Sequence, residues 1–83
     1  MKKPFMLLDV RETFERSAFN IGGEHIPLDE VIAHRDKIPT DTPVVIYCEK
    51  GIRSTILIQR LEASGFDNLY NLSGGMVNWR NTI

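Results

Sequence analysis

The only cysteine of the sequence, Cys48, ends the apolar run VVIYC and is followed closely by Lys50, Gly51 and Arg53. A cysteine that only fills space in a core needs no such neighbours. A nucleophilic cysteine does, because nearby positive charge and helix N-termini stabilise its thiolate. The pattern therefore favours a reactive thiolate at Cys48 over a structural thiol.

The segment CEKGIR is predicted to connect a strand to a helix, and such a connection can form an anion-binding cup. The backbone N–H groups of a tight turn converge on one point, and the following helix adds the positive end of its dipole. Gly51 allows the conformation that the turn requires. Lys50 and Arg53 add positive charge, whereas Glu49 opposes them. We expect a Cys48 thiol of lowered pKa in this cup.

The length of the loop separates two chemistries. Cysteine phosphatases use the pattern C-x-x-x-x-x-R to enclose a tetrahedral phosphate, but CEKGIR is one residue shorter and Ser54 stands where that arginine would be. A tighter loop has room for a single sulfur atom bound to the thiolate. Backbone donors around that atom would stabilise a persulfide anion on Cys48.

The rest of the sequence alternates short apolar runs with amphipathic segments. Strands are predicted at residues 5–10, 24–26, 44–48 and 68–72, and helices at residues 11–19, 28–37 and 53–66. Residues 73–83 are predicted to turn on two glycines into a last short helix. The segment 28–37 is expected to form one amphipathic helix, and the helix 53–66 to end at Gly65 with a Schellman motif. The alternation predicts an α/β fold with a central, mostly parallel sheet flanked by helices. Ligands bind such sheets at the carboxyl ends of the strands, where Cys48 and Asp9 fall.

Composition limits the possible classes of protein. The 83 residues suggest one domain, and a net charge of −1 gives no general attraction to nucleic acid or to an anionic membrane. A single cysteine excludes an intramolecular disulfide, and His25 and His34 stand in no metal-ligand motif. The apolar run near the N-terminus stops at Asp9, too soon for a signal sequence or a membrane span. We expect a cytoplasmic protein with Cys48 kept as a thiol.

Four segments in order, LLDVRETFE, NIGGEHIPL, VVIYCEKGIRS and LSGGMVNW, resemble single-domain rhodaneses, a family of sulfurtransferases. The resemblance implies the rhodanese fold over residues 1–83 and no metal or organic cofactor. It also implies that Cys48 carries sulfane sulfur, from a donor such as thiosulfate to a nucleophilic acceptor. That acceptor would be cyanide in an assay and a thiol or a protein in a cell. The residues that would cradle the persulfide are Glu49, Lys50, Gly51, Ile52 and Arg53.

The sequence departs from the family pattern at two places. Asn20 stands where family members commonly have a histidine, in a segment usually one residue longer. The strand and helix that usually precede the LLDVR segment are expected to be missing. Neither departure removes a residue that would handle sulfur.

Two pairs of residues are candidates for supporting the loop. Asp9 lies near the end of the first strand and Arg11 follows it, and we expect a mainly structural role, with Arg11 reaching Glu15 across one helical turn. Gly74 and Gly75 precede the last helix, and we expect them to let that turn approach the Cys48 loop closely.

Three other functions compete with a thiosulfate-type sulfurtransferase working by a ping-pong mechanism. A relay module would take sulfur from one protein and pass it to another without turning over a small donor. A phosphatase or arsenate reductase is disfavoured by the loop length. A redox sensor that oxidises Cys48 to sulfenic acid would lack a second cysteine to resolve that state. We predict the sulfurtransferase.

Overall fold

Four parallel strands form the central sheet. The computed structural model describes residues 5–82, with side chains up to residue 79. The strands are β1 (Met6–Asp9), β2 (Glu24–His25), β3 (Val44–Tyr47) and β4 (Leu69–Asn71), in the order β2-β1-β3-β4. The inner strand β3 is continuously apolar, as expected of a strand that is covered on both faces. The predicted α/β fold with a mostly parallel sheet is confirmed.

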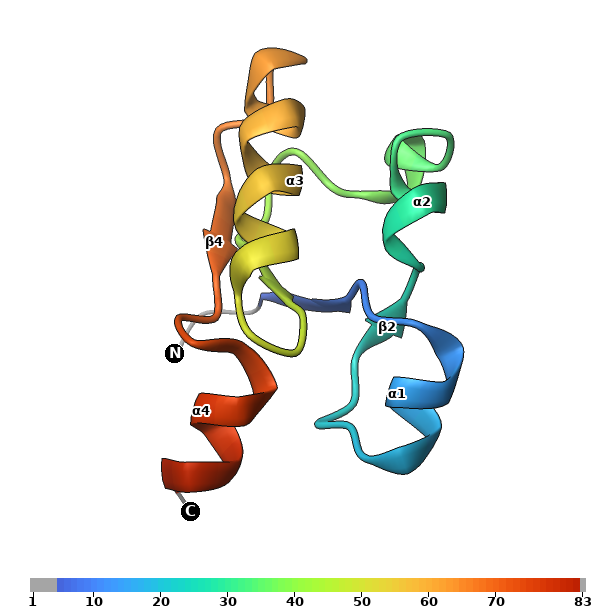
Figure 1. Cartoon of the computed structure of the whole chain (residues 1–83). Coiled ribbons are helices and arrows are strands. Elements are labelled where there is room, and N and C mark those ends of the chain that lie inside the picture. The colour runs from blue at the N-terminus through green and yellow to red at the C-terminus, as the bar shows by residue number, and fades with distance from the viewer. Residues whose placement is uncertain (1–4, 83) are drawn as a thin grey trace.

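Helices flank this sheet. They are α1 (Thr13–Ala18), α2 (Leu28–Val31), α3 (Ile52–Ala63) and α4 (Gly75–Thr82), with the short 3-10 helix η1 (Arg35–Lys37). None of the helices within residues 5–82 has both the length and the apolar character needed to cross a bilayer. Figure 1 shows the connection between β3 and α3 lying between α1 on one side and α4 on the other. Two helices that are remote in sequence therefore border the Cys48 loop.

The core lies between one face of the sheet and α3. It includes Leu8, Val44, Ile46, Leu57, Ile58 and Leu61. Successive strand residues point to opposite faces, so Leu7 and Val45 face away from α3. On that second face they line a shallow hollow together with Trp79 of α4. Trp79 thus lies away from the hollow that Cys48 lines.

The prediction of one helix over residues 28–37 is wrong. The chain forms the four-residue helix α2, a turn, and then η1, whose N–H groups bond three rather than four residues back. The winding changes at His34, which has φ −111° and ψ 22°, and it ends at Ile38, which precedes a proline and adopts the extended conformation with φ −94° and ψ 120°. The tighter winding of η1 lets the side chain of Ile38 enter the core.

The end of α3 follows the prediction. The N–H of Phe66 donates to the carbonyl of Leu61, and the N–H of Gly65 donates to the carbonyl of Glu62. Gly65 has φ 109°, a conformation that favours glycine. These are the two bonds of a Schellman motif. Glycine at this position therefore fixes where α3 stops.

Candidate active site

Cys48 follows β3 directly, at the carboxyl end of the sheet, and its side chain is fully buried. The chain then turns at Gly51, which has φ 88°, and α3 begins at Ile52. The first N–H groups of a helix have no partner within the helix, so those of the turn and the first turn of α3 are free to point toward the sulfur. The sequence thus places a thiol at the meeting point of a strand end and a helix start.

Several hydrogen-bond donors surround the sulfur of Cys48. The N–H of Gly51 donates to Sγ at 3.1 Å and the N–H of Ser54 at 3.4 Å, and the hydroxyl oxygen of Ser54 lies 3.4 Å away. Burial raises the pKa of the Cys48 thiol. The hydrogen bonds from Ser54, Gly51 and the N–H of Lys50 outweigh burial, and the net pKa lies below the ordinary value. The cup therefore favours the thiolate.

The hydroxyl of Ser54 is shared among several partners. It is fully buried and within hydrogen-bond reach of Cys48 Sγ, the carbonyl of Gly51 at 3.2 Å and the side-chain carbonyl of Asn71. Asn71 also donates to the carbonyl of Gly51 at 3.3 Å. A hydroxyl has a single proton, so Ser54 can donate to one of these partners at a time. When Cys48 is ionised, the sulfur competes for that proton.

Acidic and basic side chains line the mouth of the cup, and their formal charges cancel. A hollow of about 370 Å³ opens onto Cys48, and its lining includes Glu15, Glu49, Lys50, Ile52 and Arg53. Arg53 donates from both terminal nitrogens to the two carboxylate oxygens of Glu15, at 3.1 and 3.0 Å. Arg11 donates to Glu49 at 3.4 Å. Among the residues that line the hollow, Glu15 and Glu49 balance the charges of Lys50 and Arg53. Ionised Cys48 therefore gives the cup a net negative charge.

Behind the cup, a buried ion pair joins Asp9 to Arg11. Arg11 donates from Nε and Nη2 to the two oxygens of Asp9 at 3.1 Å each, and both side chains are almost completely buried. Arg11 also donates to the carbonyls of Glu15 and Phe19. Burial raises the pKa of Asp9, but the bonds and charge of Arg11 outweigh it and the net pKa is lowered. Arg11 thereby ties β1 and α1 to Glu49 in the loop.

The first turn of α4 closes the other side of the cup. The N–H of Met76 donates to the carbonyl of Cys48, and the N–H of Val77 donates to the carbonyl of Glu49, both at 2.9 Å. A Cβ added to Gly75 would lie 2.5 Å from the carbonyl oxygen of Cys48. Gly74 has φ 76° and its backbone N–H lies close to Gly51. The approach of the two turns therefore needs glycine.

The fold and this loop match proteins of one family. The family model for the rhodanese-like domain matches residues 1–82. The chain belongs to the rhodanese family. It is 38% identical over 78 residues to YqhL of Bacillus subtilis, covering 93% of this chain and 62% of that relative. It is 29% identical over 80 residues to the thiosulfate sulfurtransferase GlpE of Coxiella burnetii, covering 95% of this chain and 75% of GlpE.

Solved structures agree with this assignment. The rhodanese-like domain protein from Staphylococcus aureus superimposes with a TM-score of 0.84 at 30% identity, covering 94% of this chain and 76% of that structure. The family includes sulfurtransferases, as the name of GlpE states. The chain spans less than two thirds of the length of YqhL, the relative with the higher identity.

The structure brings all five predicted loop residues of this rhodanese domain together around Cys48. Glu49, Lys50, Ile52 and Arg53 line the hollow beside Cys48, and Gly51 supplies one of its hydrogen bonds. Asp9 and Arg11 do not line that hollow; Arg11 contacts the loop through Glu49, and Asp9 pairs with Arg11. Arg11 reaches the backbone carbonyl of Glu15 rather than its carboxylate.

Sequence reasoning missed three residues of the site. Ser54 follows Arg53 in the first turn of α3, where side chains lean back toward the helix N-terminus, and this direction signals its contact with Cys48. Asn71 ends β4, the neighbour of β3, so the rule that sites collect at strand ends points to it as well. The helical spacing of Glu15 suggests Arg11 as its partner, and nothing in that spacing shows a pairing with Arg53 across 38 residues.

The pKa of Cys48 gives a first test of the cup. The alkylation rate of Cys48 should rise with pH as the thiol ionises, with a midpoint below 9.0, the ordinary value, because the net shift is downward. Replacing Ser54 with alanine removes one hydrogen bond to the thiolate and should move the midpoint upward. The measurement is the rate of iodoacetamide modification against pH. Ser64→Ala, at the exposed end of α3, is the control, and an unchanged midpoint in Ser54→Ala would contradict the role given to the hydroxyl.

Two glycine variants test the contact between the turns. Gly65→Ala places a Cβ in open space at positive φ and should cost only the backbone strain, about 1–2 kcal/mol. Gly75→Ala adds an overlap with the carbonyls of Cys48 and Glu49 and should cost more. It should also slow the alkylation of Cys48, because the loop must shift. Denaturant unfolding and alkylation rates measure both effects. Equal stability and equal alkylation rates in the two variants would show that the close approach does not matter.

Proposed function

We propose that this protein is a sulfurtransferase that carries sulfane sulfur as a persulfide on Cys48. The proposal rests chiefly on one observation, the convergence of the Gly51 N–H, the Ser54 N–H and the Ser54 hydroxyl on Cys48 Sγ. These donors stabilise a thiolate, and after loading they lie where they can help hold a persulfide anion. The tight loop supports a single sulfur atom as cargo. A reducing compartment such as the cytoplasm would keep Cys48 available as a thiol.

The reaction has two displacement steps at sulfur. In the first, the Cys48 thiolate attacks the outer sulfur of a donor such as thiosulfate, and sulfite leaves with the electron pair of the broken S–S bond. In the second, a nucleophilic acceptor attacks the outer sulfur of the persulfide, and the bonding pair returns to Cys48 Sγ. Cyanide serves as acceptor in an assay, and a thiol or a protein would serve in a cell. Neither step needs an oxidant or a reductant beyond donor and acceptor.

The roles of the loop residues follow from their positions. Gly51 and Ser54 contribute donors to the sulfur, and Lys50 contributes both an N–H and a cation at the mouth. Arg53 joins the loop to α1 through Glu15, and Glu49 joins it to Arg11. Gly74 and Gly75 permit the close turn of α4. Asp9 and Arg11 act as a scaffold behind the loop.

A relay function is the second candidate, and one observation favours it. The guanidinium of Arg53 is held by both oxygens of Glu15, so among the described residues that line the cup only Lys50 offers a small dianion such as thiosulfate a cation outside an ion pair. A persulfide on a partner protein carries less negative charge than thiosulfate, so its binding depends less on a free arginine. In this role the protein would accept and pass on sulfur without turning over a small donor.

Steady-state formation of thiocyanate from thiosulfate and cyanide separates the two candidates. The enzyme proposal predicts turnover in the wild type and none in Cys48→Ser. The relay proposal predicts a persulfide on Cys48 after incubation with a persulfide donor, but negligible turnover of thiosulfate. If Cys48→Ser turned over thiosulfate at a measurable rate, both candidates would fail.

A further inference from the structure

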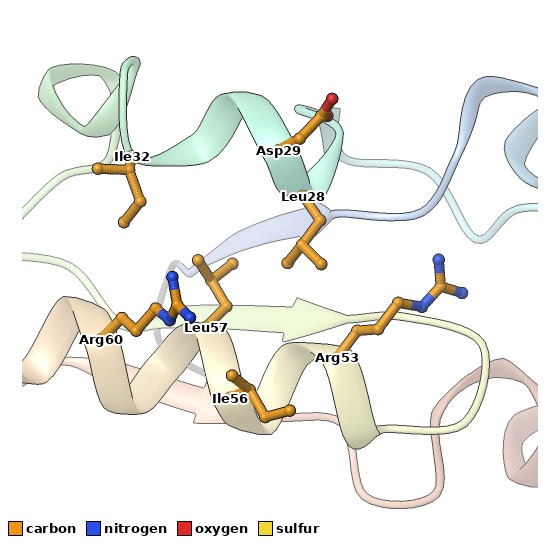
Figure 2. A pocket seen from close by; sticks show the side chains of 7 residues that line it. All are labelled: Leu28, Asp29, Ile32, Arg53, Ile56, Leu57 and Arg60. Atoms are coloured by element: carbon orange, nitrogen blue, oxygen red, sulfur yellow. The ribbon is translucent and has the colours of Figure 1, made fainter.

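A groove between α2 and α3 adjoins the Cys48 cup and has no part in the function proposed above. Its volume is about 270 Å³. Four aliphatic side chains line it: Leu28, Ile32, Ile56 and Leu57. Figure 2 shows Arg53 at one end of the groove and Arg60 at the other, both on α3. Since Arg53 also lines the hollow over Cys48, the groove begins where the cup ends.

Two exposed isoleucines connect the cup to the groove. Ile52 lines the cup and is 64% exposed, and Ile56 lines the groove and is 50% exposed. They are four residues apart on α3, so their side chains lie one above the other on the same helix face. Core packing does not explain two exposed aliphatic side chains on the same helix face. They form an apolar track that leads away from Cys48.

A cation stands at the far end of this track. Arg60 follows Ile56 by four residues and so lies on the same helix face. Within the described part of the chain, no carboxylate forms an ion pair with Arg60, whereas Arg53 is held by Glu15. The groove also has an acid, Asp29, but Figure 2 shows its carboxylate on the α2 rim, turned away from α3. From Ile52 to Arg60 the helix rises about 12 Å, at 1.5 Å per residue.

We propose that the groove binds the body of the sulfur acceptor, and that this acceptor is an organic thiol with an unbranched apolar chain ending in a carboxylate. The inference rests on the proposed function and names its acceptor class. The thiol lies over Cys48, the chain follows Ile52 and Ile56, and the carboxylate reaches Arg60.

The transfer step balances without another reactant. The acceptor thiol first gives its proton to water, and its thiolate attacks the outer sulfur of the Cys48 persulfide. A bond forms between the acceptor sulfur and the transferred sulfur. The bond from the transferred sulfur to Cys48 Sγ breaks, and its electron pair returns to Sγ. The products are an acceptor persulfide and the Cys48 thiolate.

Single-turnover transfer from the persulfide-loaded protein tests this inference. The probes are mercaptoacetate, mercaptopropionate, mercaptooctanoate and mercaptooctanol, with rates expressed per thiolate to remove differences in thiol pKa. We expect the rate at low probe concentration to be roughly tenfold higher for mercaptooctanoate than for mercaptoacetate, because burying the chain adds apolar contact. Mercaptooctanoate should also exceed mercaptooctanol, since only the acid can pair with Arg60.

Substitutions in the groove test whether its residues cause these differences in transfer rate. Arg60→Gln should remove the preference for the acid over the alcohol, and Ile56→Ser should reduce the gain with chain length. Both side chains are exposed, so these variants should fold. Arg35→Gln, an exposed arginine outside the groove, is the matched control and should keep the wild-type pattern.

The outcomes separate this inference from the proposed function. If Cys48 cannot be loaded with sulfur, the proposed function fails and the acceptor class fails with it. If loading succeeds but the rates are the same for all four probes, only the acceptor class is overturned. The acceptor class is likewise overturned if Arg60→Gln keeps the full preference for the acid.

Discussion

An Arg11→Met variant should lose about 3 kcal/mol of unfolding free energy, the lower end of the usual cost of breaking a buried ion pair, because Arg16 still pairs with Asp9. Methionine keeps much of the volume of arginine but donates no hydrogen bond. Asp9 would then lose its two side-chain bonds from Arg11, and the carbonyls of Glu15 and Phe19 would lose a donor each. Small domains have only about 5–15 kcal/mol of stability in total, so the variant should be close to unfolding.

Urea unfolding of Arg11→Met beside Arg16→Met measures this effect. Arg16 also pairs with Asp9, at 3.2 Å, but it is partly exposed and its other bond goes to the exposed carbonyl of Gly23. Arg16→Met should therefore cost much less, about 1 kcal/mol. If the two variants were equally stable, Arg11 would not be the centre of the charge network behind the loop.

Glu15→Gln should improve thiosulfate as a donor, lowering its KM by about tenfold, with little change in kcat. The carboxylate of Glu15 holds both terminal nitrogens of Arg53, and its removal frees the guanidinium for an anion at the mouth of the cup. A hydrogen bond to a charged group contributes about 1.5–3 kcal/mol, and the lower end of that range corresponds to tenfold in binding. Glutamine keeps an acceptor for the N–H of Glu12, so α1 should keep its capping contact.

The control is Glu62→Gln, which removes the same charge from the exposed far end of α3. It should leave KM and kcat unchanged. Raising the salt concentration should reduce the gain in Glu15→Gln, because Arg53 is partly exposed and its attraction for an anion is screened. A fall in kcat without a fall in KM would contradict the account, since it would mean that Glu15 positions Arg53 for the chemistry rather than neutralising it.

Local signals were sufficient to predict the architecture. The β-branched run before Cys48 predicts a buried strand, and the glycine at position 65 predicts the end of α3. The split of the segment 28–37 into α2 and η1 was not predicted. The hydrophobic spacing of the segment fits a single helix, and the one local signal against it is the proline after Ile38, which restricts Ile38 to an extended conformation. The burial of Ile38 in the core is a tertiary contact that the spacing does not show.

Some residues of the candidate site can likewise be predicted from local spacing, and others depend on the fold. Cys48, Gly51 and Arg53 are close in sequence, so their spacing indicates a loop around a thiolate. The partner of Arg53 is not local, because Glu15 reaches it only after the sheet has brought α1 beside the start of α3. Asn71 likewise meets Ser54 only through the pairing of β3 with β4. Contacts of this kind depend on the fold, and one sequence contains no direct sign of them.

The central claim is that Cys48 carries sulfur, and intact-protein mass spectrometry tests it most directly. Wild type and Cys48→Ser are incubated with thiosulfate, and in parallel with a low-molecular-weight persulfide donor, and are then treated with cyanide. We expect the wild type to gain the mass of one sulfur atom from at least one donor and to lose it to cyanide as thiocyanate, while Cys48→Ser gains nothing. A wild type that remains unmodified with both donors, or a Cys48→Ser variant that takes up sulfur equally well, would contradict it.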